Sequence, residues 1–176
     1  IIFIGIYITN EFGFTDYEFQ FFLVVGIISS IIGAFLWGFL VDSIGPKRTL
    51  NLVLCLWVIA LVFLAAIPLM SLGTGFLWVD AILAGLAMSG VWCADRPYLL
   101  RLIPTENVGE FFGVYSMVGR FASIIGPLAW VMVSDTLGFG RPIAVLTLVI
   151  FIIISYVILQ GVDDEPHIWA SNTSTT

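Results

Sequence analysis

The run LNLVLCLWVIALVFLAAIPLM, residues 50–70, decides the fold because it carries no charged side chain and is apolar on every face. As an α-helix it extends roughly 31 Å, close to the ~30 Å thickness of the hydrocarbon core of a bilayer. A strand of a membrane barrel needs only ~10 residues of alternating polarity, so a strand is excluded. The run therefore predicts a transmembrane helix.

The composition of the whole chain agrees with this prediction. Of its 176 residues, 60% are hydrophobic and 10% are charged, and the mean hydropathy is +1.12. Soluble domains have about 45–50% apolar and about 25% charged residues, so that class is excluded. Six Lys and Arg against twelve Asp and Glu give a net charge of −6, which argues against nucleic acid as a partner. We expect a polytopic membrane protein, with the lipid bilayer as its surroundings.

Similar apolar runs, separated by short polar stretches, lie on both sides of residues 50–70. We expect spans at residues 19–40, 50–70, 76–100, 112–137 and 143–162. Residues 1–8 are apolar but too short to cross, so we interpret them as the end of a truncated helix, and the chain as a fragment. The prediction is an all-α domain over residues 1–162, followed by an acidic, Ser/Thr-rich solvated tail over residues 163–176.

The cations predict the orientation of these spans. Lys47, Arg48 and Arg101 lie in loops on one side of the membrane, whereas Arg141 is the only cation in the loops of the other side. Because cytoplasmic loops carry an excess of Lys and Arg, we expect the first three in the cytoplasm. With six crossings, both chain ends and the tail are then cytoplasmic.

The sequence predicts no catalytic, cofactor or metal site. His167 is the only histidine and has no Cys or second His at ligand spacing, and the serines of the spans lack a His/Asp partner set. We therefore expect the protein not to be an enzyme. Small residues spaced by four indicate close helix packing instead, in the pairs Gly26/Ser30, Gly85/Ser89 and Gly119/Ser123.

The stretch GFLVDSIGPKR, residues 38–48, is the most specific signal. Gly38 allows a neighbouring helix to come close, Gly45 permits a turn, and Asp42 can cap the N-terminus of a neighbouring helix. The alternative is an ordinary charged loop that only sets topology. The stretch resembles the major facilitator signature Gly-x-Leu-x-Asp-Arg-x-Gly-Arg-Lys, which follows the second helix of each six-helix half. The matching positions are Gly38, Leu40, Asp42, Gly45 and the basic pair Lys47 and Arg48, whereas Ser43 and Pro46 depart from it.

A second resemblance narrows the family. Residues 96–104, 109–115, 119–122 and 126–128 are similar to the C-terminal half of the vacuole-effluxer-like branch, which groups yeast autophagy-related amino acid effluxers with uncharacterised bacterial permeases. The resemblance implies a six-helix half of a major facilitator fold that moves a small solute, in the case of the effluxers an amino acid, by alternating access. It also implies an N-terminal six-helix half as partner. Trp92 and Asp95 depart from the branch, so substrate contacts there are not carried over.

Charges inside the spans are candidates for the transport pathway or for pairs between helices. Arg120 lies roughly 12 Å inside its span and shares a helical face with Ser116 and Ser123, so we expect it to face the interior and meet an anionic solute group or Asp95. Snorkelling is the alternative for Arg120. For Arg96, snorkelling and function stay open. We expect two further carboxylates near the outer span ends to be solvated, Asp80 and Asp135.

These observations favour a secondary active transporter, a permease in the inner membrane of a bacterium or the vacuolar membrane of a eukaryote. The alternative is a non-transporting scaffold or receptor that keeps the helical framework. Burial of the Arg120 cation separates the two, because a scaffold has little reason to bury it.

The predicted orientation has a direct test. Cysteines introduced at Ser43 and Asn107 should resist impermeant thiol reagents added outside intact cells, because both loops face the cytoplasm. A cysteine at Thr74 should react under the same conditions. Labelling at Ser43 from outside would overturn the orientation.

Overall fold

The computed structural model describes residues 8–9, 12–136 and 140–162, and the only regular elements in these ranges are helices. Two short stretches flank α5, a 3₁₀ turn at Thr105–Asn107 and a π-helix at Met132–Thr136. Five of the described helices are long and apolar enough to cross a membrane. The all-α fold is thus confirmed, whereas the expected tail and most of the truncated first helix lie outside the described residues. The five helices are α2 (Asp16–Ile44), α3 (Pro46–Leu69), α4 (Phe76–Leu102), α5 (Val108–Val131) and α6 (Arg141–Gln160).

Helix α2 begins before its apolar run because a capping box, rather than hydropathy, fixes its start. At the start of α2, the Glu18 carboxylate accepts from the Thr15 backbone N–H at 2.8 Å, and the Thr15 hydroxyl accepts from the Glu18 N–H at 3.4 Å. This capping box starts the helix at Asp16, three residues before the apolar run.

The connection between α2 and α3 is a single residue rather than a loop. Helix α2 continues through Asp42 to Ile44, Gly45 turns with φ +88°, and Pro46 begins α3. Glycine adopts this φ without the steric cost that a Cβ would bring, and proline at a first helical position loses no hydrogen bond. The stretch that the sequence predicts as a loop is therefore a sharp corner with helix on both sides.

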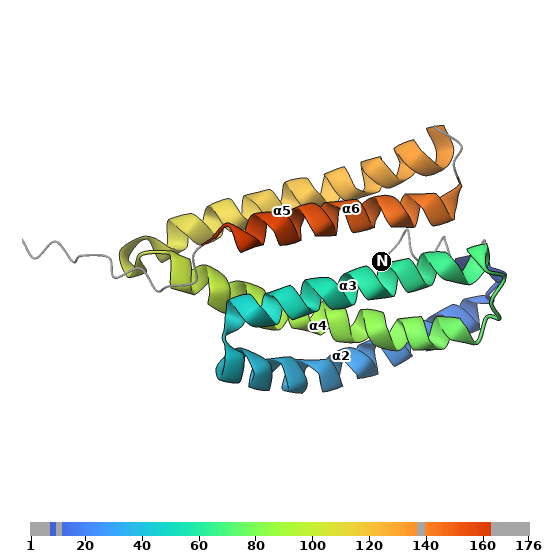
Figure 1. The fold of residues 1–176 in the computed structure, drawn as a ribbon, viewed down its shortest axis with the longest axis horizontal. Coiled ribbons are helices and arrows are strands. Elements are labelled where there is room, and N and C mark those ends of the chain that lie inside the picture. Colours follow the sequence, from blue (N-terminus) through green and yellow to red (C-terminus); the bar gives the residue numbers. More distant parts are fainter. Residues whose placement is uncertain (1–7, 10–11, 137–139, 163–176) are drawn as a thin grey trace, which may run out of the picture.

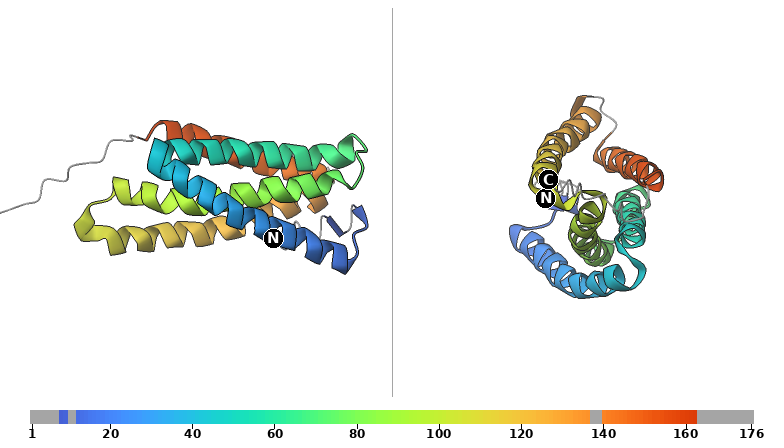
Figure 2. Two further views of the ribbon diagram at one scale, coloured as in Figure 1. Left: turned by 90° about the horizontal axis from the view of Figure 1, so that it is seen from below. Right: turned by 90° about the vertical axis from the view of Figure 1, so that its left-hand side faces the viewer.

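Helix α4 packs against both α2 and α3, α3 packs against α6, and α5 lies beside α6 (Figure 1; the end-on view in Figure 2). Helix α5 contributes a single buried residue, Trp130. It is therefore the least packed helix of the described chain.

Small residues bring α2 and α4 into close contact. A Cβ placed on Gly85 would lie 2.3 Å from the Gly26 carbonyl oxygen, and one on Gly33 would lie 2.3 Å from the Ser89 hydroxyl. No real side chain fits at such distances, so these glycines permit the approach. Further along the same interface, the Trp37 indole N–H donates to the Leu86 carbonyl at 2.8 Å.

The three predicted small-residue pairs have different outcomes. Gly85 and Ser89 both lie in the α2–α4 interface, as expected. On α2 the interface uses Ser29, which is buried against Gly85, whereas Ser30 is not in this contact. Nothing lies within 4 Å of a Cβ on Gly119, so no described helix packs on that part of α5.

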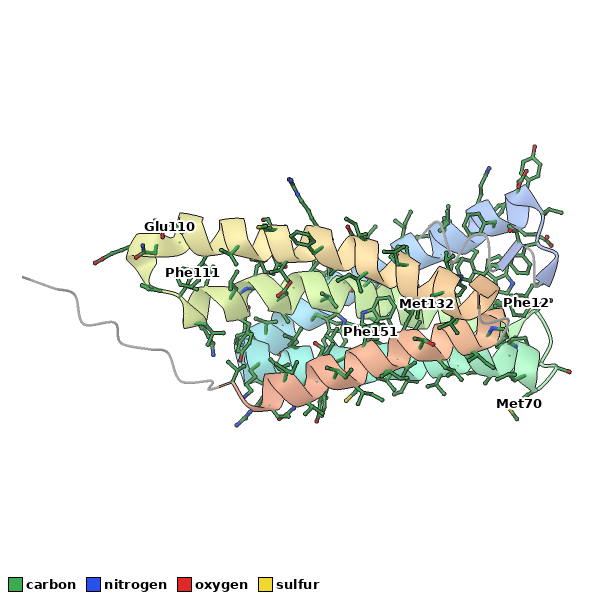
Figure 3. The ribbon with its side chains drawn as sticks, turned by 90° about the horizontal axis from the view of Figure 1, so that it is seen from above. Phe12, Met70, Glu110, Phe111, Met132 and Phe151 are labelled. Carbon is green, nitrogen blue, oxygen red and sulfur yellow. The ribbon has the colours of Figure 1, made fainter. Side chains whose placement is uncertain are left out.

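Large apolar side chains cover the outside of the bundle. Phe35 is 79% exposed, Phe39 73% and Val157 63%. Within a bilayer such side chains face lipid, and every backbone hydrogen bond along the span is made inside its own helix. The two ends of the bundle are marked by Glu110, in the first turn of α5, and by Met70, which follows α3 at the opposite end (Figure 3). The chain is a multi-pass integral membrane protein.

The close contact between α2 and α4 predicts the effect of adding one methyl group. Gly85→Ala should lower the free energy of unfolding by about 1–3 kcal/mol, because the Cβ forces two backbones apart. Thermal unfolding in detergent, followed by circular dichroism, measures the change. The matched control is Gly113→Ala, whose Cβ meets no described atom within 4 Å. Equal destabilisation by both changes would contradict the proposed packing.

Candidate functional site

Three helix ends and one corner meet at the end of the bundle that carries Lys47, Arg48 and Arg101, named here the basic end. The Lys47 ammonium donates to the Val162 carbonyl at 2.5 Å, just beyond α6. One turn further into the bundle, the Gln160 side-chain amide donates to the Asn51 side-chain carbonyl at 3.0 Å. The guanidinium of Arg101 lies 3.5 Å from the position of a Cβ on Gly45.

The role of Lys47 is clear from this geometry. The Val162 carbonyl lies two residues beyond α6, near the C-terminal end of the helix, which carries partial negative charge, so a cation there is favourable. Lys47 thus connects the start of α3 to the end of α6. Arg48, its neighbour, is exposed.

Two other members of the stretch 38–48, which we expect to act as a gating loop, have no partner among the described residues. Asp42 is exposed and makes no hydrogen bond or ion pair with them, and α3 begins without a side-chain cap. No atom lies within 4 Å of a Cβ on Gly38. The capping role of Asp42 and the close approach at Gly38 therefore need a helix from outside the described chain, and both stay predictions.

Asp95 is joined to α5 rather than to an arginine. The hydroxyl of Tyr115, on α5, donates a short hydrogen bond to the Asp95 carboxylate. The Tyr115 ring packs edge-on against the Phe112 ring, with centroids 6.1 Å apart. Arg96, the next residue on α4, is exposed and lies over the ring of Trp92, 5.5 Å from its centroid. This cation–π contact accounts for the Arg96 charge without a carboxylate partner.

Arg120 has no ion pair within the described chain. It is exposed, as are Ser116 and Ser123, and the Ser123 hydroxyl donates to the Arg120 backbone carbonyl at 2.6 Å. The suggested pairing with Asp95 is not formed, and the Asp95 carboxylate accepts a hydrogen bond from Tyr115 instead. The three residues share one face of α5, and no described helix covers that face.

Asp80 differs most from expectation. It was expected to be solvated near a span end, but it is only 3% exposed. The end of the bundle opposite the basic end is covered by aromatic rings, with Phe14 and Phe22 packed around Trp78 at centroid distances of 6.3 and 6.5 Å. The side chain of Asp135, the other carboxylate expected to be solvated, lies outside the described residues.

Sequence reasoning thus missed two features of the site, the hydrogen bond of Tyr115 and the burial of Asp80. Tyr115 carries a weak signal, since it lies three residues after Phe112 on one face of an apolar helix. Asp80 carries none, because depth along a span does not tell whether neighbouring helices cover a side chain. Within the described ranges, no three His, Cys, Asp or Glu side chains group as metal ligands.

The bond between Tyr115 and Asp95 can be measured with a double-mutant cycle. Tyr115→Phe should cost about 1.5 kcal/mol, the lower end for a hydrogen bond to a charged group. In an Asp95→Ala background the same change should cost little, because the acceptor is already gone. Chemical unfolding in detergent gives both values, and the exposed Tyr156→Phe serves as the control. An equal loss in both backgrounds would refute the bond.

Comparisons with known proteins identify the family. The model of the Major Facilitator Superfamily matches residues 1–175. The uncharacterized MFS-type transporter YxiO of Bacillus subtilis (strain 168) is 36% identical over 88 residues, which are 50% of this chain and 20% of that protein. Autophagy-related protein 22-1 of Neosartorya fischeri is 27% identical over 153 residues, 80% of this chain and 25% of that protein.

The match to autophagy-related protein 22-2 of Aspergillus clavatus is of the same kind, with 28% identity over 141 residues, 73% of this chain and 23% of that protein. The comparison with solved structures found no match. The chain spans about a quarter or less of the length of these relatives. Because the family match extends over nearly every residue, the chain belongs to the major facilitator superfamily.

Proposed function

We propose that this chain forms the C-terminal six-helix half of a permease that moves a small solute across a membrane by alternating access. The observation that carries the proposal is the family match over residues 1–175, together with five helices able to cross a membrane. In major facilitator transporters two six-helix halves move against each other around a site near the bilayer midplane. Amino acids are the first class of solute to test, because the resemblance includes amino acid effluxers.

The uncovered polar face of α5 supports a partner half on that side. An arginine deep in a span is costly in lipid and usually faces a bundle interior or a water-filled cavity. Arg120, Ser116 and Ser123 are exposed on one helix face, and no described helix covers them. A second half packed over this face would place the Arg120 guanidinium in the pathway, where its planar fork suits a carboxylate.

The basic end supports a gating role for the α2–α3 corner. Lys47 fixes the corner to α6, while Asp42 is exposed there and has no partner in the part of the chain that the structure describes. In the closed state at this end, Asp42 would cap a helix of the other half, a contact of about 1 kcal/mol. Loss of that contact on opening would let a bound solute shift the balance between the two states.

Which membrane holds the protein depends on the kind of cell that makes it. The relatives come from a bacterium and from fungi. We expect the inner membrane in a bacterium and the vacuolar membrane in a eukaryote, with the basic end in the cytoplasm in both cases.

The proposal is tested by transport in the full-length protein, reconstituted in liposomes with a mixture of labelled amino acids. Arg120→Lys should lower solute exchange by roughly tenfold or more, because lysine keeps the charge but loses the bidentate geometry. Arg96→Lys is the matched control, since Arg96 lies over an aromatic ring that an ammonium can also occupy.

Three outcomes separate the alternatives. Equal exchange by wild type and Arg120→Lys, with loss only in Arg120→Ala, would leave charge alone as the requirement. Full exchange in Arg120→Ala would remove Arg120 from the pathway. Solute binding without exchange by the wild-type protein would favour the receptor or scaffold.

A further inference from the structure

A groove of about 210 Å³ lies between α2, α3 and α4, in the part of the bundle away from the basic end. Its wall on α2 includes Phe22 and Ser30, its wall on α3 includes Trp57 and Leu64, and α4 contributes Ala84 and Asp80. Apart from Asp80 the lining is almost entirely apolar. Two other lining residues carry a polar side-chain group: Ser30, whose hydroxyl donates to the Ile27 carbonyl at 2.8 Å, and Trp57, whose indole has an N–H.

Asp80 has no partner in this groove. It lies in the second turn of α4, is 3% exposed, and its Oδ1 atom is buried without any hydrogen bond. It does not act as a helix cap, because the N-cap residue of α4 is Gly75 and the start of the helix has no side-chain capping bond. The favourable field of a helix N-terminus falls off within the first turn, so it does not compensate a charge at this position.

Among the described side chains of α2, α3 and α4, no cation faces Asp80. The groove lining from α2 and from α3 contains no titratable side chain, and on α4 Asp80 is the only one. The nearest titratable residues along α2 are the exposed Asp16, Tyr17 and Glu18, which do not line the groove and include no cation. On α3 the cations are Lys47 and Arg48, at the opposite end of the bundle.

An ionised carboxylate in such surroundings is very costly, because an apolar lining does not replace its hydration and no described cation in the lining offsets its charge. A protonated carboxyl is neutral and loses only a hydrogen bond, a penalty of about 1–3 kcal/mol. A proton is therefore the ligand that this arrangement favours. Ionisable groups inside membrane spans are rare for the same reason, and they commonly mark ion or proton pathways.

We propose that Asp80 is a proton-binding site within the membrane-embedded groove. In the packed arrangement of α2, α3 and α4 its carboxyl holds a proton. When the aromatic cover at this end opens, the proton passes to water and the carboxylate remains ionised. That this exchange couples to solute movement rests on the proposed function, whereas the proton site itself does not.

The test uses dicyclohexylcarbodiimide on the full-length protein in detergent, with the modified residue found by peptide mass spectrometry. This apolar reagent adds to the O–H of a protonated carboxyl in an apolar environment. We expect it to label Asp80 at neutral pH, and the labelling to fall about tenfold for each pH unit above the midpoint of the titration. A water-soluble carbodiimide should instead favour the exposed Asp42.

Two variants sharpen the result. Asp80→Asn is close in shape to the protonated carboxyl and should abolish the labelling, while Asp42→Asn should leave it unchanged. Ala84→Leu fills the groove without changing any charge, and it should reduce labelling of Asp80 several-fold. Unchanged labelling in Ala84→Leu would overturn the groove as the surroundings of the reactive carboxyl.

Infrared spectroscopy provides a measurement that does not depend on reagent access. The C=O stretching band of a protonated carboxyl should be present at neutral pH in wild type and absent in Asp80→Asn. Its absence from wild type would overturn the proposal, even if the transport experiments succeed. Its presence in a protein that exchanges no solute would leave the proton site standing and refute only the permease.

Discussion

The close approach of α2 and α4 at Gly26, Gly33 and Gly85 is the contact on which the rest of the bundle depends. Lipid tails are as apolar as the side chains, so helices in a bilayer gain little from apolar burial alone and associate through close packing and hydrogen bonds. The glycines permit that packing, and the hydrogen bond from Trp37 to the Leu86 carbonyl fixes its register. With α2 and α4 joined, α3 packs on α4, and α6 packs on α3.

In this arrangement α5 is the helix that packs least against the others. Its links are its contact with α6, its short connections to α4 and α6, and the hydrogen bond from Tyr115 to Asp95 near the basic end. Most of its side chains are exposed, including a polar face that would be costly against lipid. In the proposed transporter this helix borders the other half, so the element with the fewest internal contacts is the one whose position the partner half would set.

The surroundings of each charged side chain determine how its charge is stabilised. At the basic end each cation can reach water, a helix carbonyl or an aromatic face, as Lys47 and Arg96 do, and none needs a carboxylate. Arg120 and Asp80 lie within the spans and have no such partner in the described chain. Arg120 cannot lose its charge, so it needs a cavity or an anion, whereas Asp80 can become neutral by binding a proton. These two residues therefore carry the functional proposals.

The sequence alone determined the all-α class, the approximate spans and the family. Hydropathy summed over about twenty residues depends only on composition, and the stretch from Gly38 to Arg48 carries its signature in residue types. Hydropathy placed the start of α2 three residues too late, because the capping box at Thr15 extends the helix beyond the apolar run. Only the tertiary structure decided that Ser29 rather than Ser30 packs on Gly85, that Tyr115 takes the Asp95 carboxylate, and that Asp80 is buried. Each of these contacts depends on which helix lies beside which. That arrangement arises from the shapes of residues far apart in the chain and the distances between them. Local periodicity in the sequence carries no information on either.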